Sequence, residues 1–176
     1  MFYGFFYATL PTLNCGVPAE ISLEEFDRLA RNEMTEQKFA RLCSWDDREN
    51  LSPVPVYREM REFDNFLNLR IAEARQEKLG TFFTLPPVDE YHSEVDFSLP
   101  GAAASDDPSE RERMVDLIRW RKIDDLEAGH ELDFTALCCY RMRLASLEKY
   151  RKRNSGDGNS IFSAAVDKLS ESISDI

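Results

Sequence analysis

The chain has 176 residues, with 33 acidic against 22 basic side chains and a formal net charge of -11. This length is sufficient for one domain or two small ones with a buried core, and the 43% hydrophobic content excludes wholesale disorder. The acidic balance argues against nucleic acid and anionic membrane surfaces as partners, because both attract basic proteins.

The N-terminal segment, which lacks the basic residues of a signal peptide, and the cysteine pattern predict a cytoplasmic protein. The first seven residues are apolar, but they lack a basic segment and are soon followed by Pro11. We therefore expect neither a signal peptide nor direct membrane insertion. Cys15, Cys43 and the adjacent pair of Cys138 and Cys139 form no Cys-x-x-Cys motif, so buried and reduced thiols are expected.

Residues 1–80 form the first predicted part of the chain, and they carry helix signals. A weak alternation typical of a strand runs from Phe2 to Leu10. Ser22 and Glu25 then fit a capping box, and Thr35 can cap a second, shorter helix. Apolar residues follow at helical spacing: Leu23, Phe26, Leu29 and Ala30 in the first helix, and Phe39, Leu42 and Cys43 in the second.

The clearest helix is predicted between Pro55 and Leu79, where Gly80 can adopt the left-handed conformation that ends a helix. Its apolar stripe consists of Val56, Met60, Phe63, Phe66, Leu67, Ile71 and Ala74. Arg70 lies on or beside this stripe. It can extend its charge to solvent, form an ion pair with Asp124, Asp125 or Asp133, or anchor an interface.

Residues 81–106 form the second predicted part, a long irregular linker or an abbreviated subdomain. The helical pattern is lost from Thr81 to Ser105, and proline and glycine recur at Pro86-Pro87 and Pro100-Gly101. Loops of this length are uncommon inside compact domains, so a domain boundary is expected here.

Residues 107–176 form the third predicted part, and helical signals return there. Asp107 and Pro108 are typical of a helix start, Gly129 of its end, and Asp133 of a further cap. A last helix is predicted from the stripe of Phe162, Ala165, Val166, Leu169 and Ile173. The sequence therefore predicts an all-α protein, a bundle of about five or six helices with a long irregular linker in the middle.

Catalytic motifs are absent from the sequence. Gly-x-Gly-x-x-Gly, Gly-x-x-x-x-Gly-Lys-Ser/Thr and Gly-x-Ser-x-Gly do not occur. Glu127 and His130 have the Glu-x-x-His spacing of helical metal sites, and Asp89 and His92 repeat it weakly. Gly129 lies between Glu127 and His130 and is expected to end the helix there, so the two side chains do not share one rigid helix face. We therefore expect no catalytic residue, metal or cofactor. A helical metal-dependent enzyme using Glu127 and His130 stays the alternative.

Three side chains are candidates for partner binding: Arg70, Arg119 and Trp120. Tryptophan and arginine are the residue types that dominate protein interfaces. Trp120 fits either an exposed anchor or the buried side of its helix, and the sequence does not distinguish these positions.

Several short segments resemble a family of bacterial proteins encoded beside V-type (vacuolar/archaeal-type) ATPase subunits. The similarity lies in the aromatic opening of residues 2–13, in Tyr57–Asp64 and Leu69–Arg75, in Leu79-Gly80, and in the stretches 119–126, 129–134 and 140–144. That family looks like a reduced, distant relative of the C/d subunit, which joins the membrane ring of the rotor to the central stalk.

The resemblance implies a non-catalytic subunit that docks or couples the central stalk to the membrane ring. Its partners are then other V-type ATPase subunits, and its location is cytoplasmic and peripheral to the membrane. The chain is shorter than the resemblance leads us to expect, particularly between Thr81 and Asp107. A helical adaptor or chaperone unrelated to ATPases is a further alternative.

Overall fold

The computed structural model describes residues 3–47, 52–81, 84, 91–130 and 132–154. These residues form seven helices and contain no strand, which confirms the predicted all-α class. The helices are α1 (Gly4–Thr9), α2 (Leu23–Glu33), α3 (Glu36–Cys43), α4 (Pro55–Leu79), α5 (Ser93–Ala104), α6 (Pro108–Glu127) and α7 (Phe134–Asn154).

Four helices begin where the sequence places a capping side chain. The accepting oxygen and the donating backbone amide belong to Ser22 and Glu25 (3.1 Å), Thr35 and Lys38 (3.4 Å), Asp107 and Ser109 (2.9 Å), and Asp133 and Thr135 (2.7 Å). Each cap satisfies an amide that the helix itself leaves unpaired. At the end of α4, Gly80 is left-handed with a φ of 63°, as its position predicts.

Two segments differ from the sequence-based expectation. The alternation between Phe2 and Leu10 does not produce a strand, because residues 4–9 form helix α1. The segment 81–105 was expected to lack helical structure, but residues 93–104 form α5, although Pro100 lies within that helix. Proline lacks the backbone N–H and clashes with the preceding turn, so it hides a helix from pattern-based reading. The division into residues 1–80, 81–106 and 107–176 stays a prediction.

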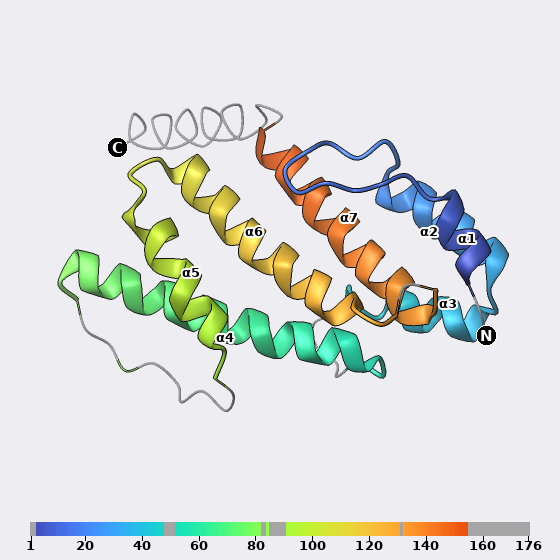
Figure 1. The fold of residues 1–176 in the computed structure, drawn as a ribbon, viewed down its shortest axis with the longest axis horizontal. Helices are drawn as coiled ribbons and strands as arrows, with labels where there is room; N and C mark the ends of the chain where they lie inside the picture. Colours follow the sequence, from blue (N-terminus) through green and yellow to red (C-terminus); the bar gives the residue numbers. More distant parts are fainter. Residues whose placement is uncertain (1–2, 48–51, 82–83, 85–90, 131, 155–176) are drawn as a thin grey trace, which may run out of the picture.

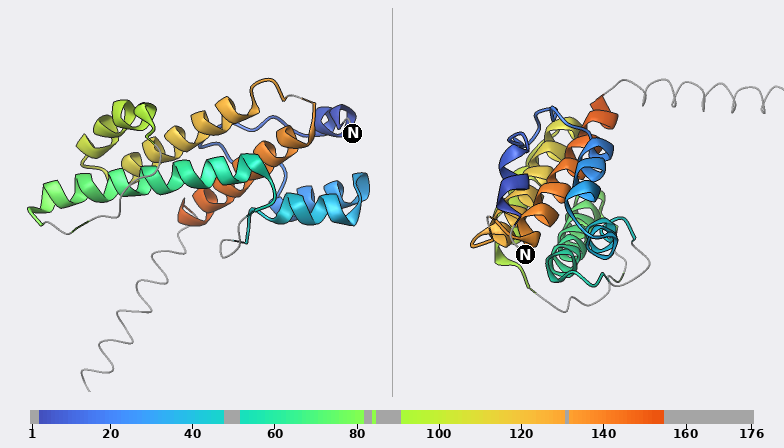
Figure 2. Two further views of the ribbon diagram at one scale, coloured as in Figure 1. Left: turned by 90° about the horizontal axis from the view of Figure 1, so that it is seen from below. Right: turned by 90° about the vertical axis from the view of Figure 1, so that its right-hand side faces the viewer.

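The three longest helices, α4, α6 and α7, form the body of the molecule (Figure 1). Helix α7 is the centre of the arrangement, because it contacts α2, α3, α4 and α6. Helices α1–α3 lie at one end of this body, and α5 packs on α4 and α6 at the other (Figure 2). The backbone amide of Leu23 also donates to Glu148 Oε1 over 2.9 Å, which ties the start of α2 to α7.

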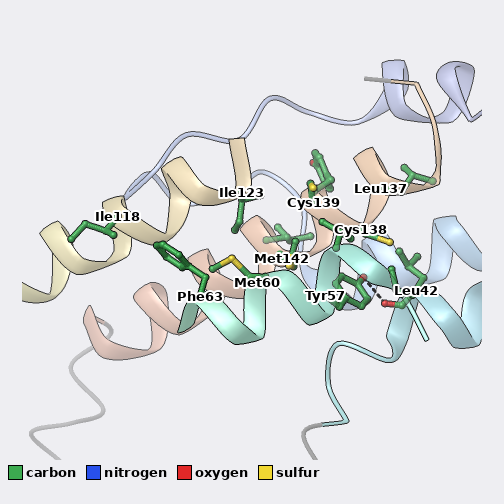
Figure 3. Packing of buried hydrophobic residues seen from close by; sticks show 14 of the residues in the cluster. Leu42, Tyr57, Met60, Phe63, Ile118, Ile123, Leu137, Cys138, Cys139 and Met142 are labelled. Carbon is green, nitrogen blue, oxygen red and sulfur yellow. Dashed lines mark hydrogen bonds between the residues drawn. The ribbon is translucent and has the colours of Figure 1, made fainter. Parts of the chain in front are cut away.

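The core lies where α4, α6 and α7 meet (Figure 3). Phe63, Cys138 and Leu144 are fully buried there. Tyr57 is also fully buried, and its hydroxyl donates to the Leu42 carbonyl over 2.7 Å, so its polar atom has a partner. Burying a large apolar side chain of this kind contributes about 1.5–3 kcal/mol to stability.

No helix within the described ranges is long and apolar enough to cross a membrane. The last predicted helix, with its stripe from Phe162 to Ile173, lies outside the described residues.

Candidate interaction surface

Helix α5 is attached to the bundle by a narrow apolar stripe. Val95, Leu99 and Ala102 are buried, and they follow one another at intervals of four and three residues. This spacing places all three on the side of α5 that faces α4 and α6.

Ion pairs hold α5 on both sides of that stripe. Towards α4, Arg70 Nε donates to Asp96 Oδ1 over 2.6 Å, and the same guanidinium contacts Glu73. Towards α6, Lys122 Nζ lies 3.7 Å from Glu94 Oε1. The pKa of Asp96 is lowered, first by the Tyr91 hydroxyl that donates to its carboxylate and then by Arg70. These contacts fix the orientation of α5 relative to the two long helices.

The outer face of α5 carries a large apolar side chain without cover. Phe97 is 91% exposed, although Val95 and Leu99 on the same helix are buried. It borders a cleft of about 620 Å³ between α5 and α6, whose rim holds Lys122 and Asp125. Aromatic side chains are enriched among the residues that dominate protein interfaces, and polar residues commonly surround them. Phe97 and this cleft form the candidate docking surface.

Arg70 is paired within the chain, and Asp124, Asp125 and Asp133 are not the carboxylates that it binds. Its partners are Asp96 and Glu73, as described above. Asp124 instead accepts from Arg143 over 2.6 Å, and Asp133 contacts His130 over 2.7 Å. Partner binding by Arg70 stays a prediction, and its guanidinium already has a structural role.

Arg119 and Trp120 occupy contrasting positions on α6. Arg119 connects α6 to α4, because its Nε donates to Asp64 over 2.9 Å and its Nη2 to Asn68 over 3.3 Å. Trp120 is 8% exposed, which places it on the buried side of the helix. The Arg143 guanidinium lies 5.8 Å from the centre of its ring. Contacts within the chain account for the positions of both residues. Their partner-binding role stays a prediction.

A second cleft, of about 380 Å³, lies between the N-terminal segment and helices α6 and α7. Arg143 is buried in its wall and pairs with Asp124 and with Glu127 over 2.5 Å. Tyr7 donates to Glu127 over 2.6 Å, and burial together with this carboxylate raises the tyrosine pKa well above its usual value. Tyr140 donates to the Pro11 carbonyl over 2.9 Å. These polar groups therefore have partners within the chain.

The predicted Glu-x-x-His pair does not converge on a metal site. Glu127 binds Arg143 and Tyr7, whereas His130 binds Asp133. His92 packs edge-on against the rings of Phe63 and Phe66, and Asp89 lies outside the described residues. Within the described part of the chain, no three His, Cys, Asp or Glu side chains are grouped so that they could hold a metal ion.

The sequence pattern did not single out Phe97, because its surroundings read as a linker. The spacing of the apolar residues around it could have identified Phe97. The run from Val95 to Ala102 contains apolar residues spaced by four and three, and Phe97 falls outside that stripe. A large aromatic residue off the buried stripe of a short helix must be exposed.

Residues 83–173 match the model of a protein family described as "Protein of unknown function (DUF2764)". No curated protein and no solved structure matches the chain. The matched region covers more than half of the sequence and includes α5, α6 and α7, so the chain belongs to the DUF2764 family.

Proposed function

We propose that this member of the DUF2764 family is a non-catalytic subunit associated with a V-type ATPase. It docks or couples the central stalk to the membrane ring, from a cytoplasmic position peripheral to the membrane. The observation that carries the docking role is the exposed Phe97 on a helix that ion pairs hold against both α4 and α6. The choice of a V-type ATPase as the partner complex comes from the sequence resemblance.

Mechanical coupling needs helices that keep their relative positions under load. Helix α4 has 25 residues, which corresponds to a length of about 37 Å. It is connected to α6 by Arg119 with Asp64, and to α5 by Arg70 with Asp96. A force applied to α5 is therefore transmitted to both α4 and α6 and does not depend on a single contact.

Purification of the complex tests the assignment directly. A tagged copy of the chain is expressed in its source organism, the membrane fraction is solubilised in mild detergent, and the proteins that co-purify are identified by mass spectrometry. We expect V-type ATPase subunits of the central stalk and the membrane ring in amounts comparable to the bait. Recovery without any ATPase subunit contradicts the proposal.

A pair of variants tests whether the candidate docking surface is used. Phe97→Ser removes the exposed ring, and we expect co-purification to fall while the melting temperature of the isolated protein is unchanged. Phe5→Ser is the matched control, because Phe5 is 84% exposed but belongs to α1, at the other end of the molecule. Equal retention of partners by both variants assigns docking to another surface.

The same material separates the alternatives. Co-purification of a different, defined set of proteins favours a general helical adaptor or chaperone. A stoichiometric transition metal, measured after purification without chelators, favours the metal-dependent enzyme instead.

A further inference from the structure

Helix α5 has a second side that the bundle leaves uncovered. Val95, Leu99 and Ala102 face α4 and α6, so the opposite side of the helix points away from both. The residues on that side are exposed and follow one another at intervals of four and three: Ser93, Phe97, Pro100 and Ala104. None of them is charged, although charged residues make up 31% of the chain. We call these four residues the outer face of α5.

An uncharged outer face is unusual for a helix at the surface of a bundle. Such helices normally present charged residues to solvent, and a helix that is apolar all round is normally covered all round. The largest side chain of the outer face, Phe97, is 91% exposed. The cleft of about 620 Å³ beside it, between α5 and α6, is large enough to receive another aromatic ring. The outer face is therefore suited to contact with a further polypeptide.

The α6 side of this cleft carries one cation and one anion that have no partner within the described part of the chain. Lys122 and Asp124 in the lining form ion pairs with other residues of the same chain. Arg121 and Asp125 are exposed, and among the described residues their side chains form no hydrogen bond or ion pair. They lie one helical turn apart with the cation first, the weaker order for a pair within one helix. Both groups are therefore available to a partner.

We propose that a second copy of this chain covers the outer face of α5, in a symmetric dimer formed through α5 and α6. A two-fold axis that passes between Arg121 and Asp125 makes the two α6 helices run antiparallel. Arg121 of each copy then faces Asp125 of the other, which gives two ion pairs, and Phe97 of each copy lies against the cleft of the other. An isologous interface requires a surface of this kind, which is complementary to itself.

The distribution of charge favours this surface for self-association. A net charge of -11 on each copy opposes contact between two copies in general. The outer face of α5 adds no charge to that repulsion, and the charges of Arg121 and Asp125 cancel. Contact here therefore has a smaller electrostatic cost than contact between acidic surfaces.

The inference concerns the candidate docking surface of the proposed function, and it describes the protein outside its complex. A second copy and an ATPase subunit cannot cover Phe97 at the same time. Self-association then keeps the ring out of water until a partner displaces the second copy. The dimer itself does not depend on the V-type ATPase assignment.

Sedimentation velocity of the full-length protein over a range of concentrations tests the proposal. We expect a reversible dimer whose share grows with protein concentration. Phe97→Ser is expected to raise the dissociation constant of the dimer by about 30-fold, the loss typical of a central aromatic anchor. Phe5→Ser, which removes an equally exposed ring from α1, is the matched control and should dimerise like the wild type.

Charge reversals identify the contact between the two α6 helices. Arg121→Asp places acidic side chains opposite each other, and Asp125→Arg places basic ones opposite each other. Each variant alone is expected to raise the dissociation constant by roughly tenfold. An equimolar mixture of the two is expected to dimerise like the wild type, because the introduced aspartate then faces the introduced arginine. Arg28→Asp on the distant α2 is the control and should leave the dimer unchanged.

The outcomes separate this inference from the proposed function, because the measurement uses the isolated protein. A monomer at every concentration overturns the inference and assigns the outer face to a different polypeptide, even where ATPase subunits co-purify. A dimer that persists in Phe97→Ser and in both charge reversals also overturns it, since another surface then joins the copies. Variants that melt at the wild-type temperature and regain the dimer only when the two reversals are mixed support the inference, whether or not ATPase subunits co-purify.

Discussion

Arg141 is 1% exposed, although it carries a charge that is costly to remove from water. Its guanidinium donates to both oxygens of Asp27 on α2, at 2.8 Å each, and to Asp46 just after α3, at 3.1 and 2.6 Å. Burial alone would lower the arginine pKa, but these two carboxylates raise it overall. The side chain stays charged and ties α7 to two separate parts of the N-terminal region.

Replacing Arg141 with methionine keeps much of the apolar stem and removes the charge. Asp27 and Asp46 then share a site without their cation, so the free energy of unfolding is expected to fall by about 3 kcal/mol. Urea denaturation followed by circular dichroism measures this change. Arg28→Met is the control, because Arg28 forms an exposed pair with Glu25 within one helix, and its loss should be much smaller. Similar losses for the two variants would contradict a structural role for Arg141.

Asp96 makes the attachment of α5 sensitive to acid. Because the pKa of Asp96 is lowered in the folded state, its ionised form stabilises α5 at neutral pH, and this contribution is lost as the pH falls through the lowered pKa. We expect Asp96→Asn to exchange amide hydrogens in α5 faster than the wild type at pH 7. The difference should begin to shrink as the pH falls below the ordinary aspartate value of 3.8, and it should vanish only below the lowered pKa of Asp96. A difference that persists there assigns the effect of the substitution to packing.

Arg70 shows how far a single residue can be interpreted from sequence. An ion pair within the chain was one of the three alternatives that its position beside an apolar stripe left open, and the structure contains one. The carboxylate could not be identified, because Asp96 belongs to a segment that was expected to lack a helix. Helical periodicity indicates which face a residue occupies, but the choice of partner depends on how helices pack.

At the scale of helices, the sequence predicts those that carry strong start and stop signals. Ser22, Thr35, Asp107 and Asp133 mark true N-termini, and Gly80 marks a true end. Helix α5 was not predicted, because Pro100 interrupts its hydrogen bonding and only three of its side chains are buried. Packing on α4 and α6 stabilises it in place of intrinsic helix propensity.

Gly80 at the end of α4 and Gly101 within α5 should respond in opposite directions to substitution by alanine. Gly80 is left-handed, so Gly80→Ala is expected to lower the free energy of unfolding by about 1 kcal/mol. Gly101 lies within α5, and an added Cβ would be 3.5 Å from Met114 Cε, an ordinary contact. Gly101→Ala is therefore expected to raise stability by about 0.5–1 kcal/mol. Urea denaturation measures both, and a loss at Gly101 would show that α5 is not a regular helix there.

At the scale of the whole molecule, composition and periodicity predicted the all-α class but not the central position of α7. The apolar residues of α7 extend around much of its circumference, with Leu137, Cys138, Cys139 and Leu144 all fully buried. A helix that is apolar on several sides must be surrounded. Its neighbours α2, α3, α4 and α6 come from distant parts of the chain, and a pattern in one helix does not name them. The candidate docking surface was missed for a different reason, because the segment that forms α5 was expected to be a linker.

The cysteines report on global unfolding. Burial raises the pKa of Cys138 to about 12 and raises that of Cys139 strongly as well, so neither forms a reactive thiolate near neutral pH. We expect iodoacetamide at pH 8 to modify the partly buried Cys15 and Cys43 first. Modification of the central pair should accelerate with urea in parallel with unfolding. Peptide mapping by mass spectrometry follows each site, and rapid native labelling of Cys138 would contradict the buried position of α7.

The central position of α7 also determines when the chain can fold during synthesis. Helices α2, α3 and α4 leave the ribosome well before α7, and each of them packs on it. Even the amide of Tyr3 donates to the carbonyl of Leu132, just before α7, over 3.1 Å. The apolar faces of these helices therefore stay uncovered in the nascent chain until α7 has been synthesised. Exposed apolar surface promotes aggregation, so translation is the stage at which this protein most needs a chaperone.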